Sequence, residues 1–187
     1  NGEHRIKEIP EVQDYFSLEI ELKKETLYNC KMVQAQDGVS VESDTLGALL
    51  YPLEGDTFAL DMVIKPERYH EFGIALHVDK ELETGYFLRM NPKNQLVAWD
   101  MWPRGEQGRY QWQIKGDVPY QIETARKLPK AEEYRVHIIK EKDICVVYIN
   151  DEIVLSTRMY NHKDGYAGIY VVQGNVKLIQ YKEKRSE

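Results

Sequence analysis

The chain has 187 residues, 42% of them hydrophobic, which suits one globular domain with a substantial core. Its formal net charge of −6 at pH 7 disfavours nucleic acid and anionic membranes as partners, because both would repel this surface. The apolar runs are too short for a membrane-spanning helix, so no contact with a membrane is expected.

Residues 1–14 are polar and contain Pro10, and we interpret them as a linker or an edge segment from an upstream domain. The opening sequence NGEHRIKEIP lacks the apolar stretch of a signal peptide. We interpret this start as a cut from a longer protein, so the missing signal peptide leaves the compartment, bacterial cytoplasm or outside the cell, open. Cys145 has apolar neighbours and is expected to be a buried free thiol, because Cys30 and Cys145 cannot form a disulfide framework by themselves.

Residues 15–182 are predicted to form the folded domain, because short alternating segments follow one another along them. At the start of this region apolar residues alternate with Ser or Glu, the period-2 pattern of a strand with one exposed face. Asp37-Gly38 is a turn signal between two such segments. The strands expected in the first part are 15–22, 27–36, 39–42 and 47–53.

The middle of the chain shows the alternation more clearly. Strands are expected at 57–64, 71–78, 86–90 and 96–102, where every second residue is large and apolar. Residues 103–133 lack a clean period and are expected to form loops around one or two short strands. The residues expected to be buried between two sheets are Phe58, Leu60, Ile74, Leu76, Leu88, Val136, Ile138, Val146 and Tyr148.

Residues 134–160 are the stretch around which the fold is expected to be organised. A half-buried strand at 134–138 is followed by a charged turn at 140–143. Residues 144–149 are apolar at every position, which predicts a central strand with both faces covered. A turn at 150–152 leads into a further strand at 153–155.

The last part of the chain is expected to form two more strands. Asp164-Gly165 turns the chain into a strand at 166–172, and Gly174-Asn175 predicts a tight hairpin turn into another at 176–181. Residues 183–187 are expected to be a solvated tail. The whole pattern predicts an all-β fold: two antiparallel sheets of about five or six strands each, packed as a jelly-roll, concanavalin-like sandwich.

The sequence VYINDEIVLSTRMY at 147–160 resembles a signature of family-32 glycoside hydrolases, the invertases, levanases and inulinases. The resemblance is to their C-terminal β-sandwich domain, and GYFLRMNPKNQLVAWDMWPRG at 85–105 is similar to an earlier hairpin of the same domain. It extends over residues 57–182. Val146 stands where many members have Glu, which indicates a divergent branch. The matching residues are Tyr148, Asn150, Asp151, Thr157, Arg158 and Tyr160.

This resemblance implies a non-catalytic accessory module of an enzyme that acts on fructan- or sucrose-type sugars. Its partners would be carbohydrate and an N-terminal five-bladed propeller catalytic domain, which the module would stabilise. Arg158 would have a structural role, tying the end of its strand to a carboxylate in the neighbouring sheet. Two alternatives stay open: an independent lectin-like carbohydrate-binding domain, and a sandwich-fold glycoside hydrolase.

The sequence itself predicts no catalytic residue, metal or cofactor. The three acidic motifs of the family's catalytic domains are absent, and so is the Glu-x-Asp-x-x-Glu strand motif of laminarinase-type sandwich enzymes. The five histidines are scattered without zinc-ligand spacing. Among 31 carboxylates, no pair is singled out as a glycosidase pair.

Two sets of residues are candidates for contact with carbohydrate or a partner. Polar side chains that lie in the non-core phase of strands assigned to one sheet could bind sugar hydroxyls, or form cross-strand ion pairs on a solvated face. Aromatic residues among Gly, Gln, Arg and Pro could lie on a sugar ring, whereas Trp99 is expected in the core. The candidates are Asp61, His77, Arg89 and His137 in the polar set, and Trp102, Tyr110 and Trp112 in the aromatic set. Because no strand period can bury all three of these aromatic residues, any ligand or partner contact is predicted in the 99–119 region.

Overall fold

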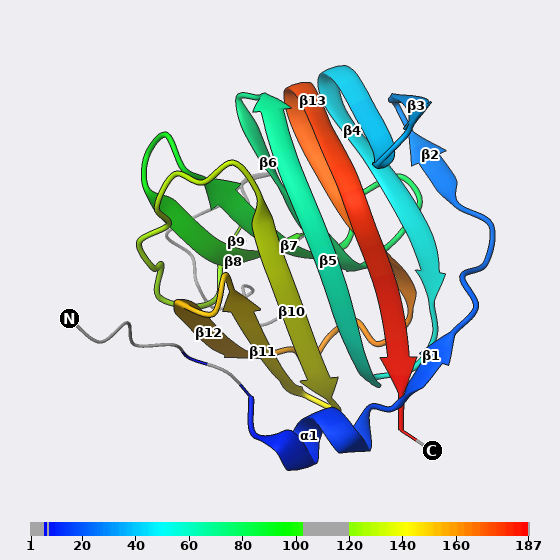
Figure 1. The fold of residues 1–187 in the computed structure, drawn as a ribbon, viewed down its shortest axis with the longest axis vertical. Coiled ribbons are helices and arrows are strands. Elements are labelled where there is room, and N and C mark those ends of the chain that lie inside the picture. The colour runs from blue at the N-terminus through cyan, green and yellow to red at the C-terminus, as the bar shows by residue number, and fades with distance from the viewer. Residues whose placement is uncertain (1–5, 7, 103–119, 187) are drawn as a thin grey trace, which may run out of the picture.

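A computed structural model describes residues 6, 8–102 and 120–186 of the chain, and in this part the protein is an all-β sandwich with one short helix (Figure 1). The helix α1 is Pro10–Tyr15. The strands are β1 Leu18–Ile20, β2 Thr26–Tyr28, β3 Lys31–Ala35, β4 Gly38–Leu53, β5 Thr57–Arg68, β6 Glu71–Val78, β7 Gly85–Asn91, β8 Leu96–Trp102, β9 Tyr120–Gln121, β10 Tyr134–Glu141, β11 Ile144–Ile149, β12 Ile153–Arg158 and β13 Gly165–Arg185.

The strands form two antiparallel layers that share β13. The layer nearest the viewer in Figure 1, here called the front sheet, has the order β12-β11-β10-β5 followed by residues 174–185 of β13. The layer behind it, the back sheet, has the order β9-β8-β7-β6 followed by residues 165–172 of β13. The predicted two-sheet antiparallel sandwich is confirmed.

Gly174 lies where β13 passes from one sheet to the other. The pairing of β13 with β4 shifts between Val172 and Gly174, and Gln173 has a left-handed φ of 49°. A Cβ on Gly174 would lie 1.8 Å from the backbone oxygen of Arg68, so only glycine fits against the β5–β6 connection. The predicted hairpin at Gly174-Asn175 is wrong: the same turn-forming residues make a bulge that bends one continuous strand.

The core lies between the two sheets and contains most of the predicted residues. Its largest fully buried side chains among the described residues are Trp99, Tyr86 and Tyr134. The burial predicted for seven residues is confirmed: Phe58, Leu60, Ile74, Leu76, Leu88, Val136 and Ile138.

The prediction that Val146 and Tyr148 of β11 face the core is wrong, because the alternate residues of this strand do so. Cys145, Val147 and Ile149 face the core, whereas Val146 and Tyr148 are half-buried on the outer side. Because every residue of this run is apolar, alternation did not indicate which set points inward. The strand does pair on both edges, with β10 and β12, but its outer face is partly open to solvent. The expected buried thiol of Cys145 is confirmed.

Strand boundaries also differ from the prediction near both ends of the chain. The separate strands expected at 39–42 and 47–53 are one strand, β4, which like β13 runs across both sheets. Residues 15–22 contain only the three-residue strand β1. Three residues of the expected solvated tail belong to β13, and the side chain of Glu183 is buried against Arg185. Within the described residues, no helix is long and apolar enough to cross a membrane.

Candidate functional site

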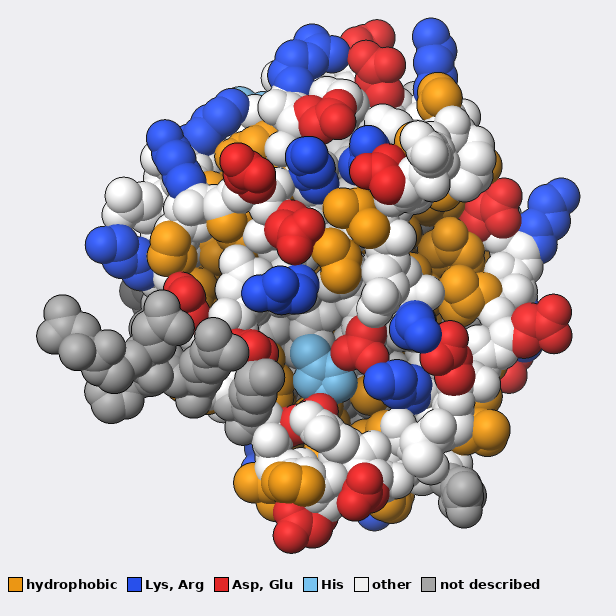
Figure 2. Space-filling model, in the orientation of Figure 1, with side chains coloured by type: hydrophobic (Ala, Val, Ile, Leu, Met, Phe, Trp, Pro, Cys, Tyr) orange, Lys and Arg blue, Asp and Glu red, His pale blue; other side chains and the backbone are white. Residues whose placement is uncertain are grey.

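A cleft of about 570 Å³ opens on the outer face of the front sheet. Its floor is formed by outward side chains of β5, β10, β11 and β13, and α1 with the residues before it forms one wall. Figure 1 shows α1 beside the ends of β10 and β5, and Figure 2 shows a histidine in the hollow of this face between acidic and basic side chains. The residues that contribute most polar groups are Glu8, Asp61, Arg135, His137, Tyr148, Gln180 and Lys184.

His137 is the centre of the polar contacts in the cleft. It lies directly opposite Asp61 in the β10–β5 pair, and its Nδ1 atom is 2.5 Å from Oδ1 of Asp61. Its Nε2 atom is 2.9 Å from Oε2 of Glu8, which reaches the cleft from the segment before α1. Lys184 of β13 donates to the other oxygen of Asp61 at 2.7 Å. Residues from four separate parts of the chain therefore form one charged network.

These contacts change the pKa of both His137 and Asp61. Burial opposes ionisation of Asp61, but the hydrogen bonds from His137 and Lys184 outweigh it and lower the pKa of Asp61 to about 2. Burial likewise opposes the charge on His137, but the hydrogen bond with Asp61 and the attraction of Asp61 and Glu8 raise the pKa of His137. The imidazole is thus stabilised as a cation that donates from both nitrogens.

The rim of the cleft adds an aromatic ring and further hydrogen-bonding groups. The ring of Tyr148 lies 6.1 Å from that of His137, measured between centroids. Arg135 is exposed at the edge, where it forms a 3.8 Å ion pair with Glu133, and Gln180 is half-buried. Together with Lys184 these groups offer several hydrogen-bond donors beside one flat aromatic surface, an arrangement that suits a polyhydroxylated ligand.

The predicted polar set does not share one face of one sheet. Asp61 and His137 meet in the cleft, as described above, but Arg89 lies on the back sheet. There Nε of Arg89 donates to Oδ2 of Asp100 at 2.8 Å and Nη2 to Oδ1 at 3.4 Å, across the β7–β8 pair. Burial of Arg89 opposes its charge, but Asp100 outweighs this and raises the pKa of Arg89. This pair is a cross-strand ion pair with a buried carboxylate, the alternative considered from the sequence.

His77 is not on an outer face, and its predicted placement is wrong. It has a left-handed φ of 52° at a register shift between β6 and β13, and its ring lies 5.5 Å from that of Phe58 in the core. Neither ring nitrogen has a hydrogen-bond partner among the described residues. Burial, with repulsion from Lys140, lowers the pKa of His77 to about 3, so the buried ring is neutral. The bulge reverses the alternation that predicted an outward side chain.

The aromatic candidates are only partly within the described structure. Trp102 is half-buried at the end of β8, and the alternation of that strand places it on the same outer face of the back sheet as Asp100. Tyr110 and Trp112 lie outside the described residues, as does most of the 99–119 region. Trp99 is fully buried, as predicted. Arg158 is exposed on β12, and within the described part of the chain no carboxylate pairs with it, so the predicted tie to the neighbouring sheet is not present there.

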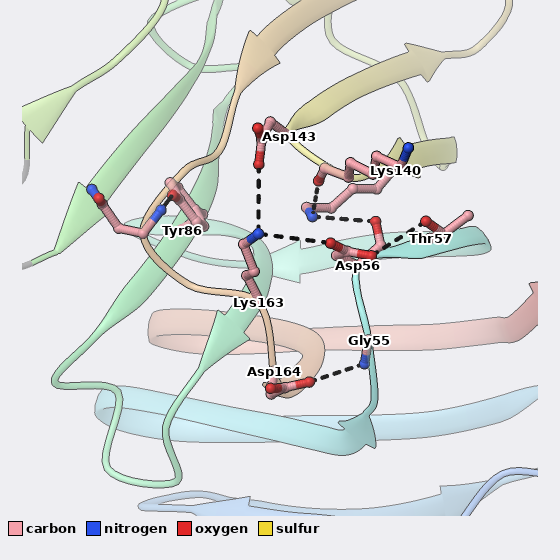
Figure 3. A network of polar contacts seen from close by, with 10 residues as sticks. Gly55, Asp56, Thr57, Tyr86, Lys140, Asp143, Lys163 and Asp164 are labelled. Atoms are coloured by element: carbon pink, nitrogen blue, oxygen red, sulfur yellow. Dashed lines mark hydrogen bonds and ion pairs between the residues drawn. The ribbon is translucent and has the colours of Figure 1, made fainter.

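A second polar cluster lies at one end of the sandwich, where the loops before β5 and before β13 meet (Figure 3). Lys163 reaches between Asp56, at 3.9 Å, and Asp143, at 4.0 Å. The fully buried Lys140 donates its ammonium protons to the backbone oxygens of Asp56 and Lys142. Every labelled group in this view has a partner within the protein, which indicates a cluster that joins loops rather than an open site.

Several cleft residues were missed by the sequence analysis. Glu8 and Lys184 were assigned to a linker and a tail, and Tyr148 to the core, so none was considered as a contact residue. Alternation gave no signal for Lys184, because a register shift between Leu178 and Gln180 changes the phase of the strand before it. Among the described His, Cys, Asp and Glu residues, no group of three could hold a metal ion.

No protein-family model and no curated protein sequence matches this chain. Solved structures do match its fold. Carbohydrate-binding module CBM66 from Bacillus subtilis superimposes with a TM-score of 0.71 at 17% identity, over 87% of this chain and 96% of that one. A protein of unknown function with a galectin-like fold from Bacillus subtilis has a TM-score of 0.63 at 9% identity, over 91% of this chain and 97% of that one. A putative glycosyl hydrolase from Parabacteroides distasonis has a TM-score of 0.59 at 15% identity, over 87% of this chain and 88% of that one.

The fold thus defines this chain as an antiparallel β-sandwich of the class that includes carbohydrate-binding modules and galectin-like proteins. Identities of this size show the shared fold alone, because one sandwich fold serves many functions. The particular resemblance to family-32 glycoside hydrolases stays a proposal.

Proposed function

We propose that this protein is a carbohydrate-binding β-sandwich module and that the cleft on the front sheet holds the sugar. The observation that carries the proposal is the position of Tyr148 beside His137 in an open cleft of about 570 Å³, with Arg135, Gln180 and Lys184 around them. An aromatic ring can lie against the apolar face of a sugar, while charged donors bind its hydroxyl groups. The fold shared with a carbohydrate-binding module supports the same function.

The contacts of His137 favour binding over acid–base catalysis by this residue. Both ring nitrogens already donate to carboxylates, so neither is free to accept a proton from a substrate. Asp61 in turn is held ionised by two cations, which makes it a poor proton donor. The cleft therefore has the character of a preorganised binding surface.

The family resemblance supports a more specific form of this proposal. The module would belong to a fructan- or sucrose-acting glycoside hydrolase and would stabilise an N-terminal five-bladed propeller. The outer face of the back sheet would then be a second contact surface, for the propeller or for carbohydrate. The observation that favours this face is that Trp102 and Arg89 both lie on it, with Trp102 only half-buried. The upstream coding sequence tests the propeller directly: a propeller with the three acidic motifs would support this form, and its absence would refute it.

The cleft itself is tested by titrating fructan, sucrose and a broad panel of neutral and acidic oligosaccharides into the protein, with calorimetric detection. Tyr148→Ala and Arg135→Ala should each weaken binding about tenfold, because each removes a contact worth roughly 1 to 1.5 kcal/mol. Matched controls are Tyr160→Ala and Arg158→Ala, which change exposed residues of the same types outside the cleft. Binding that responds equally to the controls, or no binding of any sugar, would refute the proposal.

A further inference from the structure

Glu8 reaches the cleft from a segment that has few other attachments to the domain. The helix α1 that follows it buries none of its six residues and has no side-chain hydrogen bond at its N-cap. The backbone N–H of Ile6 donates to the oxygen of Asp151 at 2.7 Å, and Phe16, after the helix, is buried. The side chain of Glu8 is nevertheless only 11% exposed, because its carboxylate lies on His137.

The Nε2 atom of His137 is a preformed partner for a carboxylate. Asp61, directly opposite on β5, takes the Nδ1 proton and so fixes the orientation of the ring. The Nε2–H bond is then directed into the cleft, toward the position that Glu8 occupies. A charged N–H donor in a partly buried site forms its strongest hydrogen bonds with an anionic oxygen.

The balance of charges around the cleft also favours an anionic ligand. Its basic residues are Arg135, His137 and Lys184, and its acidic residues are Glu8, Asp61 and Asp151. With Glu8 in place and His137 protonated, these charges balance. Withdrawal of Glu8 leaves three cations and two anions, and a neutral ligand would not compensate that excess.

We propose that Glu8 stands in for the carboxylate of the natural ligand, and that the cleft takes a carboxylated saccharide of the uronic acid class. This inference rests on the proposed carbohydrate-binding function of the cleft and names its ligand class. The sugar carboxylate replaces that of Glu8 on Nε2 of His137, and the segment of residues 8–15 moves aside. Tyr148 contacts the sugar ring, and Arg135 binds its hydroxyl groups.

The experiment compares Glu8→Gln with Glu11→Gln, which removes the same charge from an exposed position of the same segment. Each variant is titrated with uronic acid oligosaccharides and with the neutral oligosaccharides that differ only in having CH₂OH in place of each carboxylate. Glu8→Gln should bind uronates about five- to tenfold more tightly than the unaltered protein, because a neutral amide competes less well than a carboxylate for the charged donor. Glu11→Gln should leave the affinity unchanged.

A second measurement uses His137→Gln, which should abolish the preference for uronates over their neutral counterparts. Equal affinity for both sugar types, or a Glu8→Gln variant that binds uronates no better than Glu11→Gln, overturns the inference. If neutral sugars alone bind, and Tyr148→Ala weakens that binding, the proposed function holds and only the ligand class is wrong. If no sugar binds to the unaltered protein or to Glu8→Gln, both fail.

Discussion

His137 on β10 and Asp61 on β5 lie directly opposite each other, and Nδ1 of His137 is 2.5 Å from Oδ1 of Asp61. Cross-strand neighbours on one face of a sheet are held at a fixed spacing by the backbone ladder. The pair is therefore positioned by two of the longer strands of the front sheet rather than by loops. This rigidity is what permits the second nitrogen of His137 to point consistently into the cleft.

The pKa values of His137 on β10 and His77 in the core should be shifted in opposite directions. His137 has a raised pKa because Asp61 and Glu8 stabilise its charge against the cost of burial, and it should become neutral only above pH 6.5. His77 has a pKa lowered to about 3 by burial and by Lys140. Imidazole NMR signals followed between pH 3 and 9 would check this. A His77 signal that titrates near pH 6.5 would contradict the buried position at the bulge.

The pKa shifts of His137 and His77 should give the protein a pH of greatest stability, with a decline at lower and at higher pH. His137, whose pKa is raised, contributes stability that is present below about pH 6.5 and is lost as the pH rises through its folded pKa. His77 has the opposite effect on stability. Below about pH 6.5 its ring is protonated in the unfolded chain but stays neutral in the folded protein, so the free energy of unfolding falls as the pH is lowered. Urea unfolding across this range should show a smaller fall in stability on acidification when His77 is replaced by Asn, which tolerates the left-handed φ.

Replacing Asp61 by Asn should remove the charge that stabilises His137. Because the pKa of Asp61 is about 2, its contribution is present above about pH 4 and disappears as the pH falls toward 2. We expect Asp61→Asn to lower the free energy of unfolding by about 1 to 2 kcal/mol at pH 6, after allowing for solvent screening of a partly exposed group. The difference should vanish near pH 2, and the exposed control Asp44→Asn should show almost none at either pH.

Gly174→Ala should destabilise the protein through the bend in β13. A Cβ at this position meets the backbone oxygen of Arg68, which cannot move without disturbing the β5–β6 connection. We expect a loss of about 1 to 3 kcal/mol in the free energy of unfolding. The adjacent exposed variant Gln173→Gly should change it by less than about 0.5 kcal/mol, since it relieves a left-handed φ at the cost of chain entropy. Equal effects at the two positions would argue against the close approach.

The two tryptophans of β8 should differ in what their removal costs. Trp99 is fully buried between the sheets, and Trp99→Ala should lower the free energy of unfolding by about 3 to 5 kcal/mol. Trp102 is half-buried at the strand end, and Trp102→Ala should leave the protein folded with a loss of about 1 to 2 kcal/mol. Weaker binding of carbohydrate or of a catalytic partner by folded Trp102→Ala would place a contact on the back sheet.

Alternation along the chain by itself determined the fold class and much of the core. The spacing of Phe58, Leu60, Met62 and Ile64 predicts the inner face of β5 because side chains of a strand alternate strictly between two faces. The same reasoning predicted Asp61 and His137 on outer faces, where the structure places them together. It could not indicate that β5 and β10 are neighbours, because strand order depends on contacts between distant segments.

Only the tertiary structure decided the features where alternation was absent or interrupted. Tyr148 lies in a run of six apolar residues, so its side of the sheet depends on β10 and β12 and not on its own sequence. His77 and Gly174 sit at irregularities that shift the phase of a strand by one residue, and bulges have no period to detect. Glu8 joins the cleft across 129 residues of sequence, through a contact that exists only after β10 has paired with β5. Local patterns thus specify which residues face inward, whereas the charged site is assembled by long-range pairing.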